Sequence, residues 1–176
     1  MPDNRPQIRI LGPPQIQVSP SRAEAVEALL SQPKRLSLLG YLASAPRERW
    51  VSRQELLFHF WPELDETRAR KACSQTLWVL RQALGEEAIE KRGYSAVRLA
   101  PEGVQVDVWE FQGAAAEGDD ARVVELYRGE PLAGLTLPEA PAFERWLEEQ
   151  RSFTGRAARD AAWRLAEAAA ERGDRS

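Results

Sequence analysis

The stretch from Asp65 to Gly85, DETRARKACSQTLWVLRQALG, constrains the fold more than any other part of the sequence. Asp65 is a residue type that caps helix starts and Gly85 is one that ends helices, so the stretch predicts a helix. At about 100° per residue, its apolar face is predicted at Ala69, Cys73, Leu77, Leu80 and Leu84. The opposite face carries Lys71, Gln75, Trp78 and Gln82.

The charges of this helix are one-sided. From Arg68 to Gly85 the sequence holds four basic residues and no acidic residue. An apolar face for a core and an acid-free basic face together suit a helix that lies in a DNA groove. An ordinary surface helix also has an apolar stripe and some charge, so the flanking segments decide between these interpretations.

Composition narrows the class of protein. The chain has 176 residues, 43% of them hydrophobic and 29% charged, which is typical of one large or two small soluble domains. Its single cysteine, Cys73, excludes an internal disulfide framework, and its single histidine, His59, excludes a histidine-rich metal site. No apolar run approaches the roughly 18 residues of a membrane span, and the N-terminus lacks a signal-peptide core. We therefore expect a cytoplasmic protein with no membrane contact.

Charge is distributed unevenly along the chain. Residues 1–100 hold 15 Lys and Arg against 11 Asp and Glu, a net charge of +4. Residues 101–176 hold 9 against 16, a net charge of −7. This asymmetry predicts two functional units, of which the first is suited to a polyanion and the second to protein or solvent.

The segment before the helix predicts a small sheet and two further helices. Gln7–Leu11 and Gln15–Val18 are expected to form strands that turn at Gly12-Pro13-Pro14. Ala25–Leu30 has residues that favour helix, but its length and place favour a third strand, which is our interpretation. The two helices run from Pro33 to Pro46 and from a capping box, Ser52 with Glu55, to Trp61-Pro62.

The segment after the helix predicts a hairpin. Ala88–Arg92 and Ala96–Leu99 are strand-like, and Gly93-Tyr94-Ser95 between them is suited to a tight turn. Gly103–Val108 is expected to add one more strand. A small sheet, three helices and a hairpin, in this order, indicate an α+β winged helix-turn-helix domain.

From Asp107 onward the sequence predicts helices alone. The first is Val108–Glu117, and the second is capped by Asp119 or Asp120 and ends near Tyr127. A proline-containing connector, Glu130–Pro141, leads to a long amphipathic pattern over Ala142–Arg172. Gly155 within this pattern is expected to mark a kink or the joint between two helices.

Several stretches together resemble a known family. They are LLGYLASAP, then VSRQELLFHFWPELDETRARKACSQTLWVLRQALG, and then the hairpin. In order and spacing they resemble the DNA-binding domain of SARP-type antibiotic-biosynthesis activators, which share the OmpR/PhoB-type winged helix of response regulators. The stretches VDVWEFQGAA, LYRGEPLAG and FERWLEEQR are similar to the bacterial transcriptional activator domain of the same proteins.

This resemblance implies a winged helix-turn-helix domain over residues 1–106 and an all-α, tetratricopeptide-like activator domain over residues 107–176. It implies that the helix at about 66–84 enters the major groove of double-stranded DNA, and that the wing at about 89–99 contacts the minor groove or the backbone. Family members bind direct repeats and help to recruit RNA polymerase, so RNA polymerase and a second copy on DNA are expected partners. Their activator domain continues past the position of Ser176, which predicts a fragment or a truncated member.

The first turns of the recognition helix carry the leading candidates for DNA contact. Arg68, Arg70 and Lys71 are expected to contact phosphates or bases, because arginine can bind guanine N7 and O6 with two hydrogen bonds. We favour Lys71 and at least one arginine over a merely solvated face. Ser74 and Gln75 lie one turn further on, where Gln75 either pairs with adenine or solvates the helix.

Trp78 is unusual on the outer face of such a helix, where many family members carry a polar or basic residue. It contacts a sugar or a thymine methyl group, or it packs beneath the helical segment or in a dimer contact; we favour packing. Further candidates for phosphate or groove contacts are Lys91, Arg92 and Tyr94 in the wing, and Arg53 with Arg47 and Arg49 before it.

The remaining conspicuous residues are expected to be structural. His59 has no partner at ligand spacing, Cys73 lies on the apolar stripe, and core positions are expected for Trp61, Trp109, Trp146 and Trp163. The sequence has no phosphate loop, nucleophile elbow or zinc spacing, so we expect no enzyme activity, no catalytic residues, no cofactor and no metal.

These observations predict a sequence-specific DNA-binding transcriptional regulator whose helical segment serves self-association or contact with RNA polymerase. The alternative is a protein-interaction module that does not bind DNA and uses the winged helix and the helical segment as docking surfaces.

Overall fold

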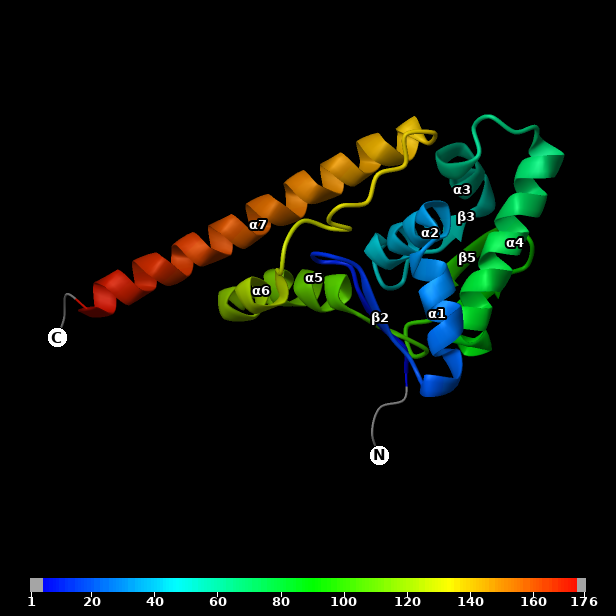
Figure 1. Cartoon of the computed structure of the whole chain (residues 1–176). Helices are drawn as coiled ribbons and strands as arrows, with labels where there is room; N and C mark the ends of the chain where they lie inside the picture. Colours follow the sequence, from blue (N-terminus) through cyan, green and yellow to red (C-terminus); the bar gives the residue numbers. More distant parts are fainter. Residues whose placement is uncertain (1–4, 174–176) are drawn as a thin grey trace.

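The computed structural model describes residues 5–173. Its first half contains β1 (Gln7–Arg9), β2 (Gln15–Gln17), the 3-10 turn η1 (Pro20–Arg22), α1 (Ala23–Leu30), α2 (Pro33–Ser44), β3 (Val51–Ser52), α3 (Arg53–Phe60) and α4 (Glu66–Leu84). The second half contains η2 (Glu86–Ala88), β4 (Ile89–Arg92), β5 (Ala96–Leu99), β6 (Gln105–Val106), α5 (Asp107–Glu117), α6 (Asp120–Leu126) and α7 (Pro141–Gly173). Figure 1 shows α1 to α4 gathered on one side of the molecule and α5 to α7 on the other.

Two small three-stranded sheets accompany the first four helices. In the first sheet, β1 lies between β2, to which it is antiparallel, and β6, to which it is parallel. Ile8 pairs with Ile16 on one side and with Val106 on the other. In the second sheet, β5 lies between β3 and β4 and is antiparallel to both. The predicted N-terminal strand pair, the hairpin and the later strand are therefore confirmed.

The interpretation of Ala25–Leu30 as a strand is wrong. These residues belong to α1, which packs against α4 and α2. Val26 and Leu29 are three positions apart, so both fall on the buried face of a helix, and the intervening Glu27 and Ala28 are exposed. The intrinsic helix preference of alanine, glutamate and leucine is the signal that decided the outcome.

The helix starts follow the caps that the sequence predicts. The backbone N–H of Glu55 donates to Ser52 Oγ at 3.1 Å, and that of Arg68 donates to the Asp65 carboxylate at 3.0 Å. The second half of the predicted capping box differs, because the Glu55 carboxylate accepts hydrogen bonds from the Tyr41 hydroxyl and from Arg49. At its other end α4 stops at Gly85, whose φ of +108° is rarely adopted by other residues.

The apolar stripe of α4 is buried as predicted. Ala69, Cys73, Leu77, Leu80 and Leu84 are all at most 2% exposed and belong to the hydrophobic core. Burial raises the pKa of the Cys73 thiol to about 11, which keeps it protonated at neutral pH. The stripe thus orients α4, and the face of the helix opposite the stripe points away from the core.

The last three helices form a segment in which α6 packs against both α5 and α7. In Figure 1, α7 begins near α3, passes α6, and extends beyond the rest of the described chain. The expected joint at Gly155 is wrong, because α7 is continuous through this residue. A Cβ atom there would lie 3.5 Å from the Tyr127 hydroxyl, an ordinary contact distance, so α7 passes the end of α6 at Gly155. Trp163, expected in the core, is 67% exposed.

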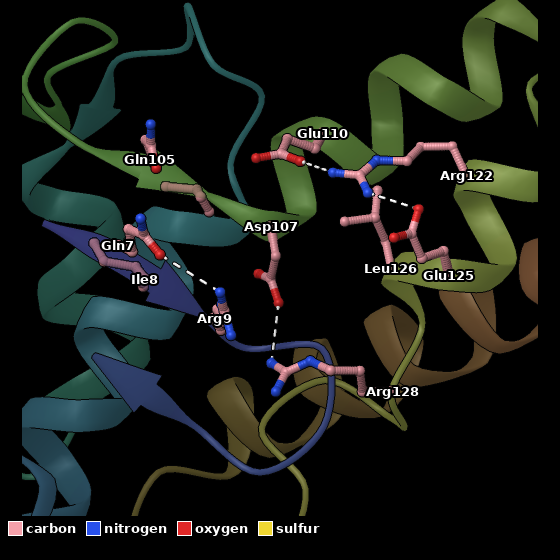
Figure 2. A pocket seen from close by; sticks show the side chains of 11 residues that line it. Gln7, Ile8, Arg9, Gln105, Asp107, Glu110, Arg122, Glu125, Leu126 and Arg128 are labelled. Atoms are coloured by element: carbon pink, nitrogen blue, oxygen red, sulfur yellow. Dashed lines mark hydrogen bonds and ion pairs between the residues drawn. The ribbon is translucent and has the colours of Figure 1, made fainter. Parts of the chain in front are cut away.

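The two halves of the chain meet at a seam built around Asp107. Its carboxylate accepts hydrogen bonds of 3.0 Å from the backbone N–H groups of Ile10 and Leu11. Arg128 lies 3.6 Å from the same carboxylate, as Figure 2 shows. Burial is the largest influence on Asp107 and raises its pKa, while these hydrogen bonds oppose the shift.

The core continues across the predicted domain boundary at residues 106 and 107. Val106 and Val108 on its two sides are both buried in the same cluster, and Phe60 of α3 packs against Phe143 of α7 at 5.1 Å between ring centroids. We retain the division into residues 1–106 and 107–176 as a proposal about function. Physically, the segments are packed together.

Candidate nucleic-acid interface

Three separate predictions converge on one concave surface. The start of α3, the first turns of α4 and the turn of the wing enclose a cleft lined by Ser52, Arg53, Gln54, Leu57, Arg70, Tyr94 and Ser95. We call it the interface cleft. Of the described residues that line it, two are arginines and none is acidic. Arg53, Arg70 and Tyr94 were each predicted to contact DNA from different parts of the sequence, and the fold brings them together.

Hydrogen bonds of Arg53 hold the cleft together. Its Nη1 donates to Ser74 Oγ of α4 at 2.9 Å, and its backbone N–H donates to the carbonyl oxygen of Ser95 in the wing at 2.8 Å. Arg53 therefore joins α3, α4 and the wing. Because the Ser74 hydroxyl is neutral, this bond does not neutralise the positive charge of the Arg53 guanidinium group.

The arginines of the first α4 turns form exposed ion pairs within the helix. Arg68 Nε lies 3.3 Å from Asp65, and Arg70 Nη2 lies 2.5 Å from Glu66. Exposed pairs of this kind are worth at most about 1 kcal/mol, so a phosphate can replace the carboxylate at little cost. Both side chains remain more than half exposed.

The outer face of α4 is open to solvent as predicted. Lys71, Ser74 and Gln75 are exposed, and within residues 5–173 no ion pair of Lys71 is found. Trp78 is 58% exposed, so our interpretation that it packs beneath the helical segment is wrong. The dimer-contact and DNA-contact interpretations of Trp78 remain predictions.

The wing presents its polar side chains on both faces. Lys91, Arg92 and Tyr94 are exposed, and Tyr94 at the turn is 93% exposed. Lys91 and Arg92 are neighbours in β4, so their side chains point to opposite faces of the hairpin. Gly93 makes this short turn with a φ of +56°.

Sequence reasoning missed Trp50, which fixes the position of Arg92. The guanidinium carbon of Arg92 lies 4.4 Å from the centre of the Trp50 ring, and that of Arg98 lies 4.5 Å from it. Arg98 is itself held by Glu48 at 2.9 Å and by Glu90 at 2.6 Å. Strand alternation puts Glu90 and Arg92 on one face of the hairpin. The sequence does not show that Trp50 lies beside them, because this depends on the pairing of β3 with β5.

Two further arginines that were predicted to contact DNA also form ion pairs. Arg47 pairs with Glu102 at 2.9 Å and Arg49 with Glu55 at 3.0 Å. Arg81, on the flank of α4, is 8% exposed, and burial lowers its pKa. Arg81 is therefore part of the interior and not of the exposed basic face.

A second charged cleft lies at the seam between β1, β6, α5 and α6. We call it the seam cleft. Arg122 pairs with Glu110 at 2.6 Å and with Glu125 at 2.7 Å, and Figure 2 shows these pairs beside Asp107 and Arg128. Its lining includes three acidic residues, Asp107, Glu110 and Glu125, and three arginines, Arg9, Arg122 and Arg128. Its charges therefore balance.

Residues 5–173 contain no group of three or more His, Cys, Asp or Glu side chains arranged to hold a metal ion. Among the same residues, no helix combines the length and the apolar character that crossing a membrane requires.

Comparison with known proteins shows the fold. No protein-family model matches the chain, and no curated protein sequence matches it significantly. Among solved structures, the chain is similar to Mycobacterium tuberculosis EmbR in complex with a low-affinity phosphopeptide, with a TM-score of 0.57 and 19% sequence identity. The likeness covers 96% of this chain and 48% of the EmbR chain, so this chain spans about half the length of that protein. The shared fold has small sheets and a helical segment.

Proposed function

We propose that this protein is a sequence-specific DNA-binding transcriptional regulator that acts in the cytoplasm. The observation that carries this proposal is the interface cleft, where the start of α3, the recognition helix α4 and the wing meet around two arginines and no acid. The fold that is shared with EmbR, a transcriptional regulator of the SARP family, supports the same conclusion.

In this proposal α4 enters the major groove of double-stranded DNA. Arg68, Arg70 and Lys71 contact phosphates or bases, and Ser74, Gln75 and Trp78 follow along the exposed faces of the helix. The 19 residues of α4 span about 28 Å at 1.5 Å per residue, which allows the part from Arg68 to Trp78 to lie along the groove.

The flanks of the cleft supply the contacts that position the protein. Arg53 binds a phosphate at the start of α3, since a helix start attracts anions. The wing contacts the next phosphate or the minor groove through Lys91, Arg92 and Tyr94. These contacts are independent of sequence and make affinity depend on salt.

The helical segment, residues 107–176, serves self-association on DNA or contact with RNA polymerase. Its net charge makes direct DNA binding unfavourable, and Val124 and Trp163 leave apolar surface exposed at 39% and 67%. Large exposed apolar side chains are typical of surfaces that contact other proteins.

Selection from a random duplex library tests the proposal. The wild-type chain is expected to enrich a shared sequence and to bind it in the presence of excess random DNA. Binding to a partner protein without salt-sensitive affinity for any duplex would instead support the protein-interaction module. Equal affinity for selected and random duplexes would contradict sequence specificity.

A further inference from the structure

We propose that Trp78 makes the protein specific for thymine by contacting the C5-methyl group of that base in the major groove. This inference rests on the proposed DNA binding and names one base that the helix recognises. Trp78 is exposed, whereas tryptophan side chains are mostly buried in protein cores.

The position of Trp78 on α4 carries the inference. At 100° per residue, Trp78 lies about 20° from Lys71 and about 40° from Ser74 around the helix axis. Ser74 bonds to Arg53 of the interface cleft, and Lys71 is exposed without an ion pair in the described chain. Trp78 therefore projects between the cleft and the outer basic face, on the side of α4 that the proposal turns toward DNA.

Contacts within the protein do not account for Trp78. It is 58% exposed, and in the part of the chain that the structure describes no ring contact or cation–π pair of its indole is found. By contrast, the Trp50 ring has two guanidinium groups within 4.5 Å of its centre, and Trp109 donates its Nε1–H to the carbonyl oxygen of Ala45 at 2.9 Å. A large apolar side chain left open on this face is available for a ligand.

The chemistry of the major groove identifies that ligand. Each base edge there presents hydrogen-bond donors and acceptors, and among the four bases thymine alone adds a methyl group. The indole ring offers an apolar surface with one N–H donor and no acceptor. It therefore matches the thymine methyl group better than any other feature of the groove.

The test combines a change in DNA with a change in protein. In the selected duplex, each thymine is replaced in turn by deoxyuridine, which removes the methyl group and preserves base pairing. Wild-type protein is expected to lose about four-fold in affinity at one or two positions, the value of one buried methyl group. Trp78→Ala is expected to bind the thymine and uracil duplexes equally, and Trp78→Phe to keep part of the preference.

Three outcomes would overturn the inference in distinguishable ways. If no thymine is sensitive to the replacement, or if Trp78→Ala keeps the full preference, Trp78 does not recognise the methyl group. If Trp78→Ala and Trp78→Phe weaken both duplexes equally, the ring contacts the sugar or backbone. If the wild-type protein binds no duplex, the proposed function itself fails. Far-UV circular dichroism verifies that both variants fold.

Discussion

The interface cleft and the seam cleft differ in how their charges are matched. In the seam cleft three arginines face three carboxylates, and Arg122 contacts two of these carboxylates at 2.6 and 2.7 Å. In the interface cleft the lining holds two arginines and no acid. Arg70 pairs with Glu66 of its own helix, outside the lining, whereas Arg53 bonds to a neutral hydroxyl and keeps an unpaired charge. A cleft whose charges are already paired stabilises the fold, whereas one with unpaired positive charge is suited to bind an anion.

The depth of burial separates the clefts further. Asp107 of the seam is 8% exposed and holds two backbone N–H groups of the N-terminal segment. Arg68 and Arg70 beside the interface cleft keep side-chain exposures of 78% and 55%. Substitutions in the seam should therefore act on stability, and substitutions at the interface should act on DNA affinity.

The largest expected effect is on stability, from Asp107→Ala. This change leaves the N–H groups of Ile10 and Leu11 buried without their acceptor, which costs about 2–4 kcal/mol in the free energy of unfolding. Denaturant unfolding measures it. The matched control is Glu110→Ala in the same cleft, whose exposed ion pair should cost less than about 1 kcal/mol. Equal losses in the two variants would show that Asp107 is not the seam's main support.

The next effect is on DNA affinity, from Lys71→Ala. Loss of one phosphate or base contact should weaken binding about ten-fold and make the log–log salt slope less negative by about 1. Fluorescence anisotropy at several salt concentrations measures both quantities. Arg156→Ala, which removes a positive charge from an exposed position on α7, is the control and should leave affinity unchanged. A loss of affinity in Arg156→Ala and not in Lys71→Ala would contradict the assignment of DNA contact to α4.

A smaller effect is expected from Trp50→Ala, because Trp50 positions Arg92 without being predicted to touch DNA. Loss of the stacking surface, worth about 0.5–2 kcal/mol, should weaken DNA binding about three-fold and leave the salt slope unchanged. Trp50→Phe should restore the affinity, since a phenyl ring also stacks on a guanidinium group. Trp163→Ala serves as a control for the removal of an indole. Full affinity in Trp50→Ala would show that DNA binding does not depend on the stacking of Arg92 on Trp50.

The smallest effect is a pH dependence from His59, which lies between α3 and α7. Burial is the largest cause that lowers its pKa, and its ring lies 4.7 Å from that of Tyr41. Because the unfolded chain binds this proton more tightly, stability is fully present above the ordinary pKa of about 6.5 and is lost as pH falls through the lowered value.

Chemical denaturation at pH 7.5, 6.5 and 5.5 measures this pH dependence. The wild-type chain should be less stable at pH 5.5 than at pH 7.5, and His59→Gln should show a smaller change. Because the chain has a single histidine, His59→Gln removes the whole contribution of histidine to the pH dependence. A parallel change in both proteins would assign the pH dependence to other groups.

The parts of the fold that could be predicted are those whose signals are local. The stripe of α4, the caps at Ser52 and Asp65, and the Gly93 turn all depend on residues within a few positions of one another. Ala25–Leu30 was misassigned because its length and place were given more weight than the helix preference of its residues. Its two buried positions are too few to establish a period.

The parts that could not be predicted depend on residues far apart in the sequence. Trp50 joins Arg92 and Arg98 only after β3 pairs with β5, and Asp107 binds Ile10 only after β6 joins β1. Helical periodicity placed Trp163 in the core, but burial depends on the neighbours of a helix as well as on its own pattern. The sequence likewise named Arg53, Arg70 and Tyr94 of the interface cleft without indicating that they line one cleft.

The salt dependence of DNA binding by the wild-type chain and two arginine variants tests the central claim most directly. The account predicts a log–log slope of roughly −4 to −5 per protomer for the wild type, since about four to six phosphates are neutralised. Arg53→Ala should make this slope less negative by about 1 and lower the affinity, while Arg122→Ala in the seam cleft should change neither. Salt-independent binding, or an equal loss of slope in both variants, would contradict it.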